Sequence, residues 1–206
     1  MRTGPYRPLQ LLAYFRRIDA LERALGQAQR LLYQDDLTPL LNRRGLRRAC
    51  DHWSASAGEV SPQTCCVMLD LDDFKSINDQ HGHPVGDAAL LHFSKTLLQH
   101  LRQADALARL GGDEFALVLT NTMATDARQV LEHLQRVLAA SPIAIVDKFV
   151  RLRFSAGIAE RKAGEPLSDA LARADTALID AKRSGKSTVR LHAPLPHCGY
   201  QPQCTV

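Results

Sequence analysis

The stretch of residues 105–119, DALARLGGDEFALVL, decides the fold of this chain. Two apolar-rich halves flank Gly111-Gly112, and the acids Asp113 and Glu114 follow at once. A Gly-Gly pair between β-compatible runs predicts a hairpin, because glycine adopts positive φ without a Cβ clash. Carboxylates just beyond such a turn lie at a sheet edge, where they could hold a hard cation and a phosphate. For this stretch alone, an ordinary hairpin with solvated acids is the alternative.

A second acidic cluster follows a predicted buried strand at 65–71, CCVMLDL. Residues 70–87, DLDDFKSINDQHGHPVGD, begin with Asp70 and Asp72, which strand alternation places on one face. A buried carboxylate is costly unless a positive group meets it, and Lys75 follows within reach. We expect the two acidic clusters to meet on neighbouring strands. Paired strand carboxylates with lysines nearby are the groups that two-metal phosphoryl transfer needs.

Periodicity and turn signals predict the other elements of an α+β fold. We expect an antiparallel-rich central sheet flanked by helices, and we place the helices on one face. Asn42 is the expected N-cap of the first of these helices. The predicted helices cover 42–57, 88–101, 124–138 and 167–183, and the further predicted strands cover 149–158 and 187–191.

An amphipathic helix is predicted before this domain, within residues 1–34. Its spacing, with alternating steps of three and four, is the a/d pattern of a coiled-coil seam, so we expect a homodimer through this helix. The alternative is a helix that packs its apolar stripe on its own domain. The stripe consists of Leu11, Tyr14, Ile18, Leu21, Leu25, Ala28 and Leu32.

Composition sets limits on the class of protein. The 206 residues are 45% hydrophobic and 23% charged, which is ordinary for a soluble globular chain. The net charge of +4 is too small and too dispersed to argue for nucleic-acid binding. Neither a membrane-spanning run nor a signal-peptide core is found, so we expect a cytoplasmic protein without membrane insertion. Five cysteines without CxxC spacing are expected to be free thiols.

Four ordered blocks, at 35–44, 70–87, 109–115 and 174–186, resemble the GGDEF domain of diguanylate cyclases. Residues 192–206 contain three prolines and no periodicity, so we expect them to be a flexible tail. The resemblance covers residues 35–191. It implies a palm-like fold similar to that of class III nucleotidyl cyclases. It also implies condensation of two GTP into cyclic di-GMP and two pyrophosphates across a dimer. The alternatives are a catalytically silent GTP or cyclic di-GMP sensor, an adenylate-using or mixed-product cyclase, and a purely structural domain.

The resemblance also implies roles for single residues. Two Mg²⁺ (or Mn²⁺) ions per active site would be held by Asp70, the backbone carbonyl of Leu71, Asp113 and Glu114. Glu114, Asp113 and Lys75 would be catalytic, with Glu114 engaging the metal or activating the attacking 3′-hydroxyl. Asn78 and Asp87 would read guanine, the lysines would neutralise the triphosphate, and the glycines would let the backbone approach the nucleotide. The implied substrate-binding residues are Phe74, Lys75, Asn78, His83, Asp87, Gly111, Gly112, Lys182 and Lys186.

Arg102 and Asp105 match the family's RxxD site, at which the product cyclic di-GMP inhibits. The alternative is that Arg102 ends a helix and Asp105 starts a strand. A second arginine is usually needed, and the choice between Arg128 and Arg136 stays open.

Four residues depart from the family pattern, and none of them is a metal ligand or a base reader, so we expect an active site. They are Pro39 for Gly, Ile179 for Tyr, Lys186 for Arg and Ser187 for Asn. The expected input is an activating partner protein that aligns the two N-terminal helices, or expression level alone.

Overall fold

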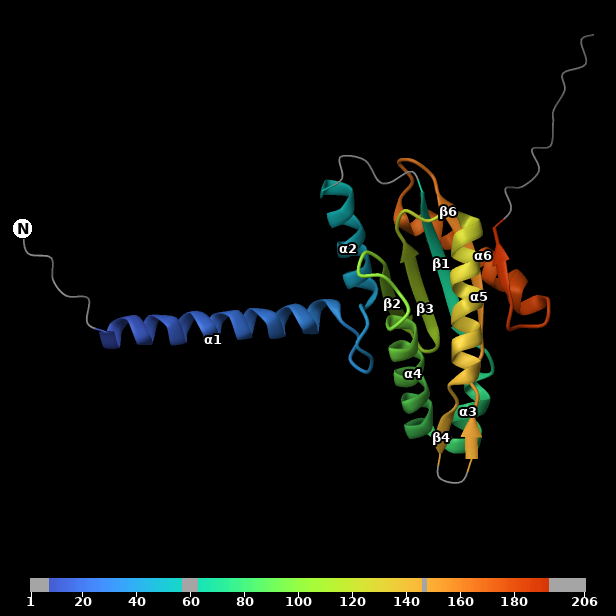
Figure 1. The fold of residues 1–206 in the computed structure, drawn as a ribbon, viewed down its shortest axis with the longest axis horizontal. Helices are drawn as coiled ribbons and strands as arrows, with labels where there is room; N and C mark the ends of the chain where they lie inside the picture. Colours follow the sequence, from blue (N-terminus) through green and yellow to red (C-terminus); the bar gives the residue numbers. More distant parts are fainter. Residues whose placement is uncertain (1–7, 57–62, 146–147, 193–206) are drawn as a thin grey trace, which may run out of the picture.

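The computed structural model describes residues 8–56, 63–145 and 148–192, with a five-stranded sheet at its centre (Figure 1). The strands are β1 Thr64–Leu71, β2 Ala106–Gly111, β3 Glu114–Leu119, β6 Phe154–Arg161 and β7 Val189–Leu191. They lie in the order β2-β3-β1-β6-β7. All neighbours pair antiparallel except β6 and β7, which are parallel. The expected antiparallel-rich α+β sheet is therefore confirmed.

Helices cover both faces of this sheet, so the expectation that they share one face is wrong. They are α1 Pro8–Tyr33, α2 Arg43–Ser56, α3 Phe74–His81, α4 His83–Leu98, α5 Ala124–Ala140 and α6 Leu167–Arg183. Helices α4 and α5 pack on the face with Val67 and Leu69 of β1, and α2 and α6 on the face with Cys66 and Met68. All eight residues of β1 are buried, so each face needs its own helical layer.

Local differences from the predicted elements concern short segments. The strand expected at 149–158 is divided. Its first part, β5 Lys148–Val150, pairs with β4 Ile143–Ile145 in a separate two-stranded ribbon, and β6 begins only at Phe154. Helix α3 was not predicted, because it has eight residues and buries none of them, which leaves no apolar period to read. The expected cap of α2 is confirmed, since the Gly45 N–H donates to Asn42 Oδ1 at 2.9 Å.

Helix α1 projects away from the sheet, with α2 beside its C-terminal end (Figure 1). The side chains of Tyr14, Leu21 and Leu25 in its apolar stripe are 63%, 62% and 61% exposed. The stripe therefore does not pack on the domain that follows it, and the coiled-coil interpretation keeps its physical basis. None of the described helices is both long and apolar enough to cross a membrane.

The cysteine prediction is confirmed where the structure describes the chain. Cys65 and Cys66 are buried free thiols, and Cys50 is buried as well. Burial raises the pKa of Cys66 to about 12, so this thiol stays protonated and unreactive. Cys198 and Cys204 lie outside the described residues, as does the predicted tail beyond residue 192.

Candidate active site

The turn between β2 and β3 brings the two acidic clusters together. Gly112 has φ 53°, the left-handed conformation that glycine adopts without strain. Directly after it, the Asp113 carbonyl accepts the Leu71 N–H at 3.3 Å, and Glu114 lies opposite Asp70 in the β1–β3 register. The expectation that the clusters meet on neighbouring strands is confirmed.

A cleft of about 530 Å³ opens at this end of β1. It is formed by the end of β1, helix α3, the hairpin, the C-terminal end of α6 and the loop after α6. It is lined by Asp70, Leu71, Asp72, Asp73, Phe74, Lys75, Ser76, Asp79, Gln80, Asp113, Lys182 and Lys186. Seven of these were named as site residues from the sequence. The remaining predicted metal- and substrate-binding residues do not line the cleft itself; they are Glu114, Asn78, His83, Asp87, Gly111 and Gly112.

Asp70 is a buried carboxylate with one close cation. Only 8% of the residue is exposed, and its Oδ2 lies 2.7 Å from Lys182 Nζ. Burial raises the pKa of Asp70 and the neighbouring Asp113 carboxylate adds to this, while the Lys182 ammonium opposes the rise. The net shift is upward, so Lys182 does not fully compensate the buried charge. A further cation at this point would stabilise the ionised form.

Asp72 is equally buried but fully engaged within the chain. Its Oδ1 accepts the Ser155 hydroxyl at 2.7 Å, and its Oδ2 accepts the Ser187 N–H at 2.8 Å and the Ser187 hydroxyl at 2.9 Å. Ser187, one of the four departures from the family pattern, thus serves as a double donor. These contacts tie the loop after α6 to the end of β1, so Asp72 organises the cleft wall.

Two lysines, one in the last turn of α6 and one in the loop after it, pair with acids of the cleft. Lys186 Nζ donates to Asp73 Oδ1 at 2.7 Å, and this hydrogen bond lowers the pKa of the Asp73 carboxyl. Asp73 has φ 59°, which a non-glycine residue adopts only when its surroundings hold it. With Lys182 on Asp70, the cleft gathers Lys75, Lys182 and Lys186 around its acids, a charge pattern suited to a polyphosphate with metal ions.

The expected base readers Asn78 and Asp87 lie on the neighbouring helices α3 and α4. Asn78 lies on α3 against Gly86 of α4, where a Cβ on Gly86 would sit 1.9 Å from Asn78 Oδ1. Gly86 therefore permits the close approach of the two helices, and Asp87 is the next residue of α4. The sequence reasoning missed this role of Gly86. His83 is exposed at the first residue of α4.

Arg109 was also missed, although it stands next to the central hairpin. Its Nε donates to the Gly112 carbonyl at 2.9 Å, and its Nη1 donates to Asp35 Oδ1 at 3.1 Å. Burial alone would raise the pKa of Asp35, but hydrogen bonds from Thr38 and the Arg109 guanidinium give a net lowering. The ion pair joins the turn that carries Asp113 to the segment just after α1.

The RxxD residues meet in a second hollow of about 300 Å³, away from the cleft. Arg102 and Asp105 line it together with Asp126 and Gln129 of α5. The Asp105 carboxylate accepts the Arg102 N–H at 3.0 Å, so it also closes the turn before β2. Neither residue belongs to α4, which ends at Leu98, so the idea that Arg102 ends that helix is wrong.

A divalent metal is implied by the resemblance, and the cleft fits one. In the described part of the chain no three His, Cys, Asp or Glu side chains gather tightly enough to hold a metal ion by themselves. Asp70, Asp113 and the backbone of Leu71 nevertheless present hard oxygen donors at one place, and Asp70 lacks sufficient positive charge. Mg²⁺ is usually held by one or two carboxylates together with substrate phosphates, so this donor set is sufficient.

Comparisons with known proteins agree with this geometry. Residues 32–188 match the family model described as "Diguanylate cyclase, GGDEF domain". Diguanylate cyclase DgcP of Pseudomonas aeruginosa is 36% identical over 157 residues, which cover 76% of this chain. The chain spans 23% of the length of this curated relative.

Two solved structures share the fold over most of the chain. The diguanylate cyclase SiaD of Pseudomonas aeruginosa, in complex with its activator SiaC, has a TM-score of 0.74 and 33% identity, covering 90% of this chain and 72% of that one. The coiled coil and GGDEF domain of DgcB from Caulobacter crescentus, in complex with c-di-GMP, has a TM-score of 0.76 and 28% identity, covering 89% and 98%. The chain belongs to the diguanylate cyclase GGDEF domain family.

Proposed function

We propose that this chain is a diguanylate cyclase that condenses two GTP into cyclic di-GMP with release of two pyrophosphates. The observation that carries the proposal is the cleft at the end of β1, where Asp70 and Asp113 meet Lys75, Lys182 and Lys186. Family membership supports the same chemistry. The cytoplasm, where GTP is available, stays the predicted location.

In the proposed reaction the 3′-hydroxyl oxygen of one GTP forms a bond to the α-phosphorus of the other. The bond from that phosphorus to its bridging oxygen breaks, and pyrophosphate leaves; a second, reciprocal transfer closes the ring. Glu114, exposed at the start of β3, would accept the hydroxyl proton or engage the metal. Lys75, Lys182 and Lys186 would neutralise the triphosphate, and the first turn of α3 would offer backbone N–H groups to it.

Two Mg²⁺ or Mn²⁺ ions per site are part of the proposal. Asp70, Asp113 and the Leu71 carbonyl would hold them, and Glu114 would complete the set from the cleft rim. When bound, the ions supply charge neutralisation and polarise the phosphate oxygens. Release of Lys182 from Asp70 toward the triphosphate is compatible with its position, because the Lys182 side chain is 40% exposed.

Guanine would be read by Asn78 and Asp87, and the close contact of α3 with α4 at Gly86 and Asn78 supports this assignment. A carboxylate accepts from the guanine N1–H and N2–H groups, and adenine offers no such pair of donors. Phe74 and His83 would flank the nucleotide, and Gly111 and Gly112 leave open space above the hairpin. Asp87→Ala is therefore expected to weaken selection of GTP over ATP.

The reaction requires two sites face to face, so we propose a homodimer through the seam of α1. The uncovered Leu21 and Leu25 supply the apolar surface for it. The solved structure of DgcB, which comprises a coiled coil and a GGDEF domain, supports this arrangement. An activating partner protein is the proposed input, in line with the activator complex of SiaD.

Product feedback at Arg102 and Asp105 is the remaining part of the proposal. The two side chains share a hollow with the N-terminal half of α5, and neither candidate for the second arginine lines it. Arg128 lies on α5 between Asp126 and Gln129 in the sequence, and its guanidinium pairs with Glu132 at 2.8 Å. Arg136 lines a separate hollow with Arg153 and Phe154, so the choice between the two arginines stays open.

The direct test is turnover of purified chain with GTP and Mg²⁺, with the product identified by mass spectrometry. We expect cyclic di-GMP with GTP and no cyclic dinucleotide with ATP alone. Asp113→Asn, assayed in parallel, controls for a contaminating cyclase. Binding of GTP or cyclic di-GMP without turnover would contradict the proposal and would identify a silent sensor of the same family.

A further inference from the structure

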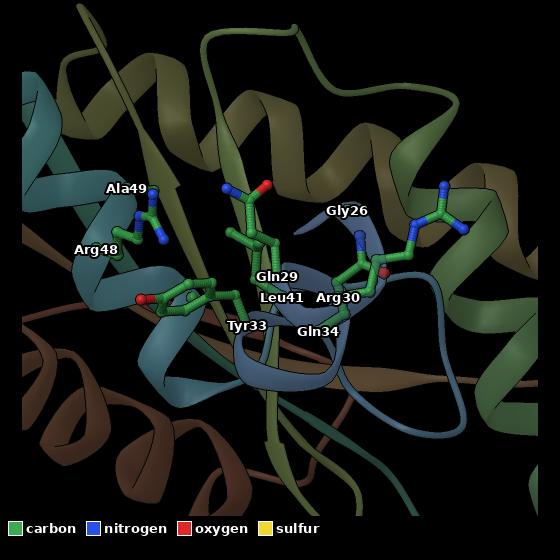
Figure 2. A pocket seen from close by; sticks show the side chains of 9 residues that line it. Gly26, Gln29, Arg30, Tyr33, Gln34, Leu41, Arg48 and Ala49 are labelled. Carbon is green, nitrogen blue, oxygen red and sulfur yellow. The ribbon is translucent and has the colours of Figure 1, made fainter. Parts of the chain in front are cut away.

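A groove of about 480 Å³ runs between the C-terminal half of α1 and the N-terminal half of α2 (Figure 2). Its α1 wall carries Gly26, Gln29, Arg30 and Tyr33, and its α2 wall carries Arg48 and Ala49. None of the cleft residues lines this groove. The proposed cyclase chemistry therefore leaves it without a role.

The groove combines an apolar floor with a positively charged wall. Leu41 and Ala49 form half-buried apolar surface at its base. Figure 2 shows the Arg48 guanidinium beside the Tyr33 ring, and the guanidinium carbon lies 4.3 Å from the ring centroid. This contact holds the Arg48 side chain over the groove while leaving its N–H donors available.

The positive charge of the groove is not compensated within the described chain. Arg30 and Arg48 are exposed, the lining contains no Asp or Glu, and no ion pair among the described residues involves either arginine. Arg44 and Arg47 add charge on the neighbouring turn of α2. A ligand that fits this surface therefore carries carboxylates toward the walls and an apolar side chain toward the floor.

A second copy of α1 does not occupy the groove in the proposed dimer. With Leu25 and Leu32 at position a and Ala28 at d, Gly26 and Tyr33 fall at b, Gln29 at e and Arg30 at f. Positions b and f lie on the outer side of a coiled coil. The groove thus stays open when two chains pair, and it is available to a third molecule.

We propose that this groove is the docking site for an acidic, amphipathic segment of a partner protein. Binding of the segment does not depend on the proposed cyclase function. Only the expected consequence of binding, control of turnover, rests on that function. The groove lies between two helices and is concave, a shape that suits a protein segment and not a flat membrane surface. Its two wall arginines are also too few for the row of phosphate contacts that nucleic acid binding uses.

Docking there bears on the active site through a short chain of contacts. The Tyr33 carbonyl, at the end of α1, accepts the Asn42 N–H at 3.0 Å. Two residues later Asp35 accepts from Arg109, which donates in turn to Gly112 of the catalytic hairpin. A segment bound to both walls fixes α1 relative to α2, and with it the end of α1 from which this connection starts.

Binding is tested on the full chain with a fluorescein-labelled peptide that carries glutamates on one helical face and leucines on the other. The control peptide has each glutamate replaced by glutamine. We expect fluorescence anisotropy to show binding of the glutamate peptide at least tenfold tighter than that of the control. Arg48→Glu and Gly26→Leu should each weaken it at least tenfold. Gly26→Leu fills the groove and improves helix propensity, so it cannot act by unfolding α1.

Arg16→Glu is the matched control, because it makes the same charge change at an outer f position far from the groove, and it should alter binding less than twofold. Equal binding of the two peptides, or undiminished binding by Arg48→Glu and Gly26→Leu, would overturn the proposal. So would capture of the chain by phosphatidylserine vesicles or single-stranded RNA without peptide binding. Fluorescence anisotropy does not depend on turnover, so the binding result can be interpreted even if the cyclase assay shows no activity.

Discussion

The acidic edge of the sheet and helix α1 differ in how complete they are within one chain. At the edge, Asp72 has three hydrogen-bond donors and Asp70 has Lys182. On α1, by contrast, Leu21 and Leu25 are more than 60% exposed. The acidic groups of the cleft are thus arranged by a single fold, whereas the apolar seam is left uncovered within one chain. In the proposed enzyme, the acidic groups would perform the chemistry and the seam would bring two chains together.

The largest effect is expected at the acidic edge. Asp113→Asn removes a metal-binding charge without changing size, so turnover should fall roughly a thousandfold while Tm and oligomeric state stay unchanged. Cyclic di-GMP production measured by chromatography gives the first quantity, and thermal unfolding the second. Asp79→Asn also removes a carboxylate from the cleft but not from the metal site, so it should cost less than about threefold. Equal losses in the two variants would refute the assignment of Asp113.

A smaller, concentration-dependent effect is expected on α1. Leu21→Asp places a charge in the seam, so turnover per chain should fall more than about tenfold in dilute protein and recover at high concentration. Gln27→Asp makes the same charge change on the outer side of the helix and should leave the concentration dependence intact. Assays over a dilution series distinguish the two. Activity per chain that stays constant on dilution of Leu21→Asp would remove α1 as the dimer element.

The hollow that contains Arg102 and Asp105 belongs to neither region. A substitution there should change product inhibition without changing initial turnover or pairing of the chains. Arg102→Ala should raise the cyclic di-GMP concentration needed for half-inhibition about tenfold and leave initial turnover near wild type. This variant is preferable to Asp105→Ala, because Asp105 also closes the turn before β2. Gln103→Ala is the control on the same exposed segment. Unaltered inhibition of Arg102→Ala, followed by calorimetry that shows unaltered product binding, would exclude this site.

The smallest effect concerns stability at the acidic edge itself. The raised pKa of Asp70 means that the folded state favours the protonated form of this carboxyl group. Protonated Asp70 therefore contributes to the free energy of folding below the pKa of the unfolded chain, and this contribution is lost as the pH rises through the pKa of the folded chain. Asp70→Asn should therefore raise Tm by about 2 °C at neutral pH without metal, and the gain should vanish near pH 4. Asp72→Asn should instead lower Tm, because it loses charge-assisted hydrogen bonds. Melting curves from pH 4 to 7 check both.

The parts of the site that could be predicted from the sequence are those encoded in local patterns. The Gly-Gly hairpin, the buried strand before Asp70 and the heptad stripe each leave a short-range signal, and each is present in the structure. The pairing of Lys182 with Asp70 and of Arg109 with Asp35 joins residues far apart in the chain, so only the packing of the helices reveals it. The continuous apolar run of β1 predicts burial on both faces of the sheet, and hence helices on both faces. The expectation of helices on one face did not use this feature.

The different surroundings of Asp70 and Asp72 could not be predicted from the sequence either. Strand alternation places both carboxylates on one face, and nothing local distinguishes them. The distinction comes from Ser155 and Ser187, which satisfy Asp72 from two other elements and leave Asp70 to face the cleft. In the proposed enzyme, the hydrogen bonds from Ser155 and Ser187 would therefore make Asp72 a structural residue and leave Asp70 to bind metal.

The central claim is that two chains must each hold a competent site for one product molecule to form. It is tested most directly by mixing wild type with Asp113→Asn at a fixed total concentration high enough for pairing, after subunit exchange has reached equilibrium. A hybrid dimer can complete at most one of the two transfers, so activity should follow the square of the wild-type fraction, about a quarter at equal amounts. A linear fall, with about half of the activity left at equal amounts, would show that each chain works alone and would contradict the account.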